Sequence, residues 1–126
     1  MTDSSTTIAD LKRAVLDFSR ARDWEQFHNP KDLGLALAIE TGEVLEYFRF
    51  KTDAETQAEL ADPSKRRDLS HELADVLWAL TRLADVLSID LSAALEEKLA
   101  LADVKYPADQ SRGRNDKYTA YQGDAT

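Results

Sequence analysis

The period of the apolar residues is the feature that most constrains the fold of this chain. From Leu69 to Leu87, the segment LSHELADVLWALTRLADVL places apolar residues three or four positions apart and contains neither glycine nor proline. This spacing gathers apolar side chains on one face of a helix, and the segment Leu35–Phe48 follows a similar pattern. With 4 glycines and 3 prolines in 126 residues, the composition also favours helix over sheet.

Capping residues divide the chain into four long helices and one short one. Ser, Thr, Asp or Asn before a periodic segment, or proline at its first position, is typical of a helix start. The expected long helices run from Thr6 or Thr7 to about Ala21, from Asn29-Pro30 to about Lys51, from Asp62-Pro63 to near Asp90, and from Asp90 to about Lys105. The short helix begins at Thr52, which can form a capping box with Glu55.

Four long helices with short connections predict an all-α fold, a four-helix bundle. The length suits a single domain over residues 1–126. We expect residues 1–6 and 107–126 to be flexible or tail segments, because the sequence after Pro107 is polar and has no helical period.

Composition restricts the functions open to the chain. It has no cysteine, which excludes disulfides and zinc–thiolate sites and agrees with a reducing compartment. Its N-terminus does not resemble a signal peptide, and no segment approaches membrane-spanning length. A formal net charge of −8 argues against binding a nucleic-acid polymer, although a metal ion can bridge acidic residues to phosphates. We therefore expect a cytoplasmic protein with no membrane or nucleic-acid partner.

Four acidic residues lie in or beside the apolar faces of two long helices. Glu40 projects from the middle of one apolar face, and Glu43 lies one turn further on. Glu72 borders the apolar face of the other helix, and Asp75 lies one turn beyond it. Each pair directs two carboxylates at one small volume, where they repel each other unless a cation neutralises them.

These carboxylates have two interpretations. An acidic pair on a helix is usually solvated, and the chain would then be a non-catalytic acidic helical interaction module. Two pairs on neighbouring helices favour a divalent cation instead, since Lys31, Arg49 and Arg82 could reach but none is placed to neutralise all four acids. Oxygen ligands without cysteine select a hard ion, Mg²⁺ or Mn²⁺. A di-iron site is disfavoured because it needs two Glu-x-x-His motifs, and only Glu25 with His28 forms one.

Several segments, taken together, resemble a known family. RDWEQFHNPKDLGLALAIETGEVLEYFRFK, HELADVL, KYP and SRGRNDKYTAY follow one another between about Leu11 and Tyr121. They resemble the MazG-like all-α NTP pyrophosphohydrolases, and most closely their dCTP pyrophosphatase branch. The resemblance implies hydrolysis of a nucleoside triphosphate, dCTP or a related pyrimidine deoxynucleotide, to the monophosphate and pyrophosphate. The Mg²⁺ ligands that it implies are Glu40, Glu43, Glu72 and Asp75.

The same resemblance implies a substrate pocket. The residues expected around the base and sugar are Trp24, Phe27, His28 and Phe50. Those expected near the phosphates or the rim are Lys98, Lys105, Tyr106, Arg112, Lys117 and Tyr118. Glu43 by preference, or else Glu40, is the candidate catalytic base that accepts a proton from the attacking water.

Members of the family assemble as dimers or tetramers, and we expect a homo-oligomer here, a tetramer rather than a dimer. The sequence supports assembly independently. Leu35, Ile39 and Leu45 point away from the first apolar face of their helix, so this helix is apolar nearly all round.

The chain departs from the dCTP-preferring branch at positions that would line the base pocket. It has Val15 in place of a histidine, Phe50 in place of a tryptophan and Ala79 in place of a tyrosine. An asparagine near the end of the last long helix appears as Ala102 or Asp103. These changes remove hydrogen-bonding groups, so we expect only modest discrimination among pyrimidine bases.

Overall fold

The computed structural model describes residues 1–122, and every regular element within them is helical. The all-α prediction is therefore confirmed. The chain forms two compact units, and the boundary between them in the sequence falls between Ile89 and Asp90. The elements of the first unit are α1 (Ile8–Arg20), a 3₁₀ helix η1 (Glu25–Phe27), α2 (Pro30–Leu45), α3 (Asp53–Leu60) and α4 (Pro63–Val86). Those of the second unit are α5 (Leu91–Lys105), α6 (Ala108–Ser111) and a 3₁₀ helix η2 (Tyr118–Tyr121).

The helices begin at the capping residues that the sequence indicates. Thr7 accepts a hydrogen bond from the backbone N–H of Asp10, and the Asp10 carboxylate accepts one from the N–H of Thr7 in return. Thr52 and Glu55 form the same reciprocal pair at the start of α3. Such caps satisfy backbone donors that have no partner inside the helix, which is why these starts are predictable.

The second long helix is shorter than expected, since α2 ends at Leu45 rather than near Lys51. Beyond it the backbone hydrogen bonds tighten, from Tyr47 to Val44 and from Phe48 to Leu45. Phe50 then adopts a left-handed conformation with φ of 62°, which a helix cannot continue through. The prediction of a helix to about Lys51 was therefore wrong, because the regular helix ends at Leu45 and cannot resume through Phe50.

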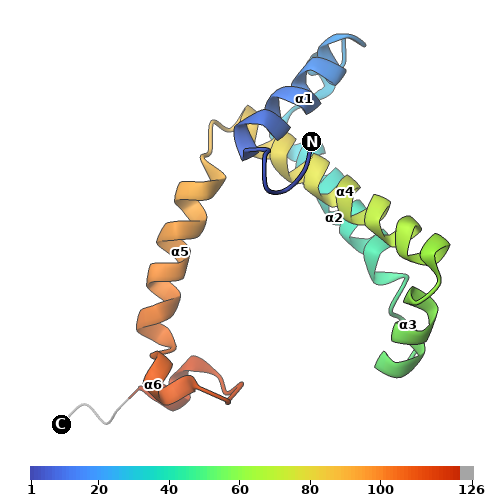
Figure 1. Cartoon of the computed structure of the whole chain (residues 1–126). Coiled ribbons are helices and arrows are strands. Elements are labelled where there is room, and N and C mark those ends of the chain that lie inside the picture. The colour runs from blue at the N-terminus through green and yellow to red at the C-terminus, as the bar shows by residue number, and fades with distance from the viewer. Residues whose placement is uncertain (123–126) are drawn as a thin grey trace. The chain divides into compact units, whose positions relative to one another are not determined.

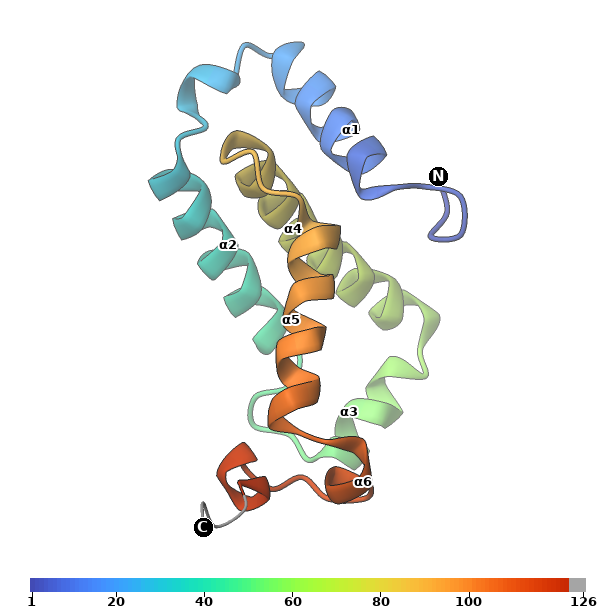
Figure 2. The ribbon, with the colours of Figure 1, turned by 90° about the vertical axis from the view of Figure 1, so that its left-hand side faces the viewer.

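In the first unit, α2 lies alongside α4 in both ribbon views, and this is the most extensive helix–helix contact of the chain (Figures 1 and 2). Helix α1 also packs on α4. The core between these helices is small: its buried apolar side chains are Leu33, Ala79 and Ala84. The contact of α2 with α4 matters most for function, because the four acids lie on these two helices.

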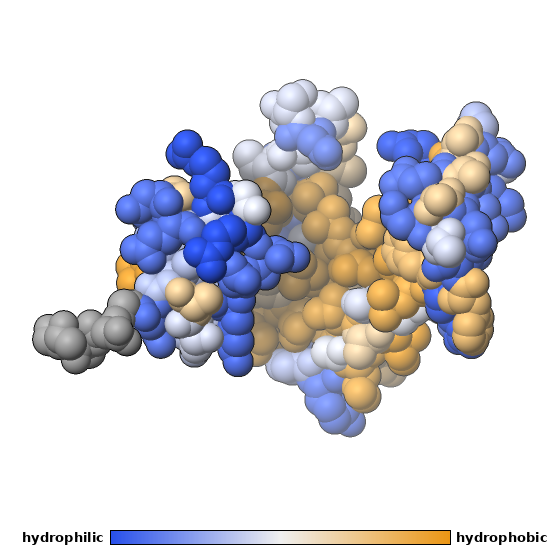
Figure 3. Space-filling view, turned by 90° about the horizontal axis from the view of Figure 1, so that it is seen from below, coloured by the Kyte–Doolittle hydropathy of each residue, from blue (hydrophilic) through white to orange (hydrophobic). Residues whose placement is uncertain are grey.

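Many large apolar side chains remain exposed. Leu35, Ile39 and Leu45 on α2 are each more than half exposed, on the side that the sequence assigns to assembly. Leu95, Leu99 and Val104 on α5 are exposed as well. Hydrophobic residues accordingly cover much of the surface seen in Figure 3.

The second unit is held together by tyrosine rings. Tyr106 packs edge to face on Tyr118 and Tyr121, with ring centroids 6.4 and 5.9 Å apart. The segment after Pro107 therefore contains two short helices, α6 and η2, which its lack of period did not predict. Residues 123–126 of the expected tail lie outside the described residues. The predicted fourth long helix is α5, and its packing into one bundle with the other three stays a prediction. No helix of the described chain is long and apolar enough to cross a membrane.

Candidate metal centre and substrate pocket

Three of the four predicted acids converge at the contact of α2 with α4. Carboxylate oxygens of Glu40, Glu43 and Glu72 all lie within 4.8 Å of one another. Glu40 and Glu72 are half-buried, whereas Glu43 is exposed. Asp75 is not part of this trio, although it lies close enough to influence the titration of Glu40 and Glu72.

When no cation is bound, the carboxylates of the trio repel one another. Burial, followed by the charges of Glu43 and Asp75, raises the pKa of Glu40. Burial also raises the pKa of Glu72, and the nearby Glu43 carboxyl group adds to this. One carboxylate oxygen of Glu72 is buried and has no hydrogen-bond partner. An unpartnered carboxylate oxygen requires either a proton or a cation.

The basic side chains that could have neutralised the trio are engaged elsewhere. Within residues 1–122, no lysine or arginine forms a salt bridge with any of the four predicted metal ligands. The three candidates form the pairs Lys31–Asp32 at 3.4 Å, Arg49–Glu46 at 2.8 Å and Arg82–Asp85 at 2.8 Å. Three oxygen ligands without a protein cation, one of them with an unpartnered buried oxygen, fit a hard divalent ion.

A cavity of about 300 Å³ adjoins the acids, and both Glu40 and Asp75 line it. His28 is the predicted pocket residue that shares this lining. The remaining lining residues are Leu33, Ala36, Trp78 and Ala79. The volume is at the lower end of the range for small-molecule sites.

Sequence reasoning missed Trp78 as a lining residue. The signal was available, because Trp78 follows Asp75 by three positions and so lies on the same face of α4. Ala79 lines the cavity at 6% exposure, in the place where the resemblance leads one to expect a tyrosine. The cavity wall therefore has a tryptophan beside it but no tyrosine hydroxyl.

Local structure fixes the position of His28 between two helices. Its backbone N–H donates to the carbonyl of Glu25, which closes η1, and Asn29 immediately caps α2. The Arg82 Nε–H donates to His28 Nδ1 at 3.0 Å across 54 residues of sequence. Arg82 is 5% exposed and also contacts Asp85 at 2.8 Å and Glu25 at 3.8 Å. Burial, followed by the Arg82 charge, lowers the pKa of His28, which favours the neutral ring.

The other aromatic residues predicted around the base do not line this cavity. Trp24 packs edge to face on Phe18, with ring centroids 5.9 Å apart, and Phe18 packs in turn on Trp78 at 4.9 Å. Trp24 thus supports the cavity through two rings. Phe27 is 63% exposed and Phe50 is 90% exposed.

In the second unit, five of the six predicted phosphate and rim residues meet around a cavity of about 410 Å³. They are Lys98, Lys105, Tyr106, Lys117 and Tyr118. The Lys105 ammonium lies 5.1 Å from the centre of the Tyr118 ring. Arg112 caps α6 and is exposed. Three lysines around one cavity favour an anionic ligand.

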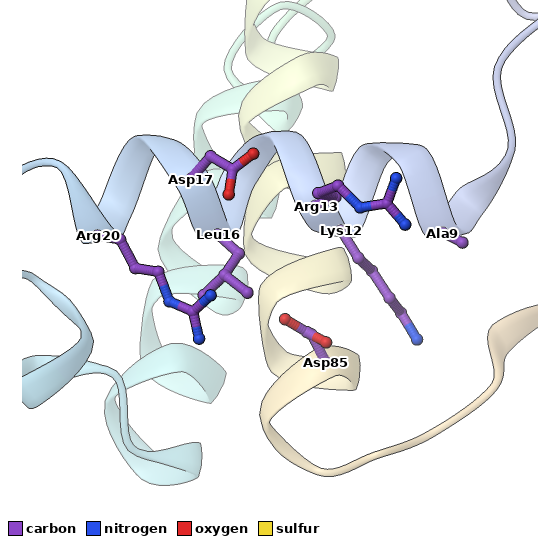
Figure 4. A pocket seen from close by; sticks show the side chains of 7 residues that line it. All are labelled: Ala9, Lys12, Arg13, Leu16, Asp17, Arg20 and Asp85. Atoms are coloured by element: carbon purple, nitrogen blue, oxygen red, sulfur yellow. The ribbon is translucent and has the colours of Figure 1, made fainter.

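A further cavity of about 400 Å³ lies on α1, and Figure 4 shows its lining. Lys12 and Arg20 of α1 extend on either side of Asp85 in this view. Lys12 donates to the carbonyl of Ile89, and Arg20 pairs with Glu25 at 3.0 Å. Both cations are therefore already partnered.

The fold and the site together define an all-helical protein with a candidate divalent-metal centre beside a small-molecule cavity. Comparison with known proteins narrows this class. The model of the MazG-like family matches residues 35–120, a range that contains all four predicted metal ligands. The chain belongs to the MazG-like family.

Its relatives include dCTP pyrophosphatase 1 from Homo sapiens and from Bos taurus. The human protein is 42% identical over 113 residues, 90% of this chain and 66% of its own length. The bovine protein is 40% identical over 123 residues, 98% of this chain and 73% of its own length. The chain thus spans about two thirds of the curated relatives that it matches. A crystal structure of a pyrophosphatase from Archaeoglobus fulgidus superimposes with a TM-score of 0.73 at 28% identity, covering 85% of this chain and 98% of that one.

Proposed function

We propose that this protein hydrolyses deoxynucleoside triphosphates, dCTP or a related pyrimidine nucleotide, to the monophosphate and pyrophosphate. The observation that carries the proposal is the acid trio beside a cavity lined by Glu40, Asp75 and His28. The identity with proteins called dCTP pyrophosphatase 1 and the match to a pyrophosphatase structure support the same reaction.

We propose Mg²⁺, with Mn²⁺ as the alternative, as the ion of the acid trio. When bound, such an ion neutralises phosphate charge and makes water a better nucleophile. Glu40 of α2 and Glu72 of α4 would hold the ion, and Asp75, which lies outside the trio, would be a further ligand. Glu43 is the exposed member of the trio, which suits a base that takes a proton from water.

The chain's own side chains then orient the substrate. The pyrimidine ring of the substrate occupies the cavity beside Trp78, and His28 lies at the edge of this cavity. Lys98, Lys105 and Lys117 line the cavity of the second unit, where their positive charges suit an anionic group such as phosphate. Val15 and Ala79 have no polar side-chain atoms, so discrimination among pyrimidine bases is modest.

We also propose that the chain assembles with further copies of itself, as a tetramer, in the cytoplasm. Leu35, Ile39 and Leu45 form an exposed apolar strip on α2. A strip of this kind on a chain with so small a core is typical of a contact surface.

The test is a panel of nucleoside triphosphates with separate detection of pyrophosphate and orthophosphate. Pyrophosphate release from pyrimidine deoxynucleotides, dependent on Mg²⁺ and lost on chelation, is the expected result. Release of orthophosphate with a diphosphate product would refute the bond that is cut. No turnover of any triphosphate, together with no stabilisation by Mg²⁺, would favour the alternative of a non-catalytic interaction module.

A further inference from the structure

The contact of Arg82 with His28 has a consequence for what the cavity can recognise. A guanidinium group has only N–H donors and no acceptor. The ring nitrogen of His28 that faces Arg82 at 3.0 Å must therefore carry a lone pair, whichever way the ring is placed. In a neutral imidazole the proton then resides on the other nitrogen.

Burial and two ion pairs fix the position of the Arg82 side chain beside His28. It is 5% exposed, and its guanidinium contacts Asp85 at 2.8 Å and Glu25 at 3.8 Å while the Nε–H is directed at His28. Protonating His28 would set an N–H donor against the Arg82 donor. The contact thus favours one tautomer of a neutral ring over both other states.

The protonated nitrogen is free to meet a ligand. Within residues 1–122, Arg82 is the hydrogen-bond partner found for the His28 ring, and the second nitrogen is not among the buried atoms left without a partner. His28 lines the cavity with Trp78 and Ala79, neither of which offers a competing acceptor from its side chain. The other polar groups of the lining are the carboxylates of Glu40 and Asp75 and the indole N–H of Trp78, which is a donor.

We propose that Arg82 is a positioning residue that fixes the tautomer of His28, so that the second ring nitrogen presents an N–H donor to the base. This proposal rests on the proposed function for the identity of the ligand. A donor selects an acceptor, and the acceptor that all pyrimidine bases share is the O2 carbonyl. His28 therefore recognises pyrimidines as a class through O2 and does not read the 4-amino group of cytosine.

The tautomer can be measured without substrate. Long-range ¹H–¹⁵N NMR of the full chain, labelled at histidine, separates the two neutral tautomers and the charged ring. The chain has 2 histidines, and His71→Gln assigns the remaining signals to His28. We expect the proton on the nitrogen remote from Arg82. A charged ring at pH 7, or a proton on the nitrogen nearest Arg82, would overturn the proposal whatever the activity.

Three substitutions separate positioning from stability. Arg82→Met removes the donor and should release the tautomer, whereas Arg82→Lys keeps a donor and should restore it. Asp85→Asn is the matched control, because it weakens the ion pair of Arg82 with Asp85 but leaves the Arg82 Nε–H in place beside His28. We expect Asp85→Asn to lower Tm without changing the tautomer. If Arg82→Met does not fold, the comparison of Arg82→Lys with Asp85→Asn carries the test: a changed tautomer in Asp85→Asn alone would refute positioning by Arg82.

Kinetics test the recognition of O2. Replacing O2 of dCTP by sulfur weakens the acceptor and should raise KM by about 3- to 10-fold with little change in kcat. The same replacement should have no effect on a His28→Ala enzyme, and Arg82→Met should add nothing to His28→Ala. If sulfur at this position raises KM equally in wild type and in His28→Ala, His28 does not recognise O2. A wild-type chain that hydrolyses no triphosphate would refute the proposed function and the reading of O2, while the NMR result would still decide the tautomer.

Discussion

Replacing Glu40 with glutamine should stabilise the chain when no metal is bound. The Glu40 carboxylate is half-buried and lies within 4.8 Å of the Glu43 carboxylate. Two unit charges at this separation repel by about 1 kcal/mol in water and by about 3.5 kcal/mol at an effective dielectric constant of 20. Because Glu43 is exposed, solvent screens the pair and the lower figure is the better guide. We expect a gain of about 1 kcal/mol, or about 4 °C in Tm for a chain of this length.

Thermal unfolding followed by circular dichroism measures this gain. The protein is first melted with a chelator at low ionic strength, where repulsion is least screened, and then at high salt, where the gain should shrink. Mg²⁺ should reverse the order, since wild type retains a ligand that the variant has lost. Glu46→Gln is the matched control on the same stretch of chain, because Glu46 pairs with Arg49 at 2.8 Å outside the trio. Its Tm should change by less than about 2 °C.

Two results would show that the reasoning is wrong. In the first, Glu40→Gln melts at or below the temperature of wild type in chelator, which means that repulsion among the acids does not strain the fold. In the second, Mg²⁺ raises the Tm of Glu40→Gln as much as that of wild type, which removes Glu40 from the ligand set.

Three further predictions concern pH, assembly and phosphate binding. The pKa values of Glu40 and Glu72 are raised in the folded chain, so the folded state retains protons that the unfolded state has lost. The Tm measured without metal should therefore rise as the pH falls from 7 toward the ordinary carboxyl pKa of 4.5. A flat or falling Tm over this range would contradict the prediction. Ile39→Asp places a charge on the exposed apolar strip of α2 and should lower the mass measured by light scattering, with a monomeric wild type as the contrary result. Lys105→Ala removes a cation from the lysine-lined cavity and should raise KM for the triphosphate about tenfold, whereas an unchanged KM would place the phosphates elsewhere.

The starts of the helices were predictable because each depends on a few neighbouring residues. Thr7, Asn29, Thr52, Asp62 and Asp90 all accept a hydrogen bond from a backbone N–H two or three residues ahead. The end of α2 was not predictable in this way. No glycine, asparagine or proline lies between Leu45 and the left-handed Phe50, so the sequence gives no stop signal there.

The convergence of Glu40 with Glu43 was predictable from the sequence, whereas most residues that line the neighbouring cavity were not. The difference is again between local and long-range contacts. The spacing of three residues on one helix places Glu40 with Glu43 without any knowledge of tertiary structure. Which aromatic ring faces the cavity depends instead on how α1 packs against α4, so Trp24 was preferred where the structure has Trp78. The contact of Arg82 with His28 joins residues 54 positions apart, and no local pattern indicates it.

The small core has a consequence for how much of this protein is active in a cell. Among the described residues, the buried apolar side chains are only Leu33, Ala79, Ala84 and Tyr121, which supply little stability to an isolated copy. If neighbouring copies cover the leucines of α2, the free energy of unfolding includes the free energy of association and so varies with protein concentration. Expression level would then set the folded fraction by mass action. Substitutions far from the acids could silence the enzyme at low abundance and leave it intact when overproduced.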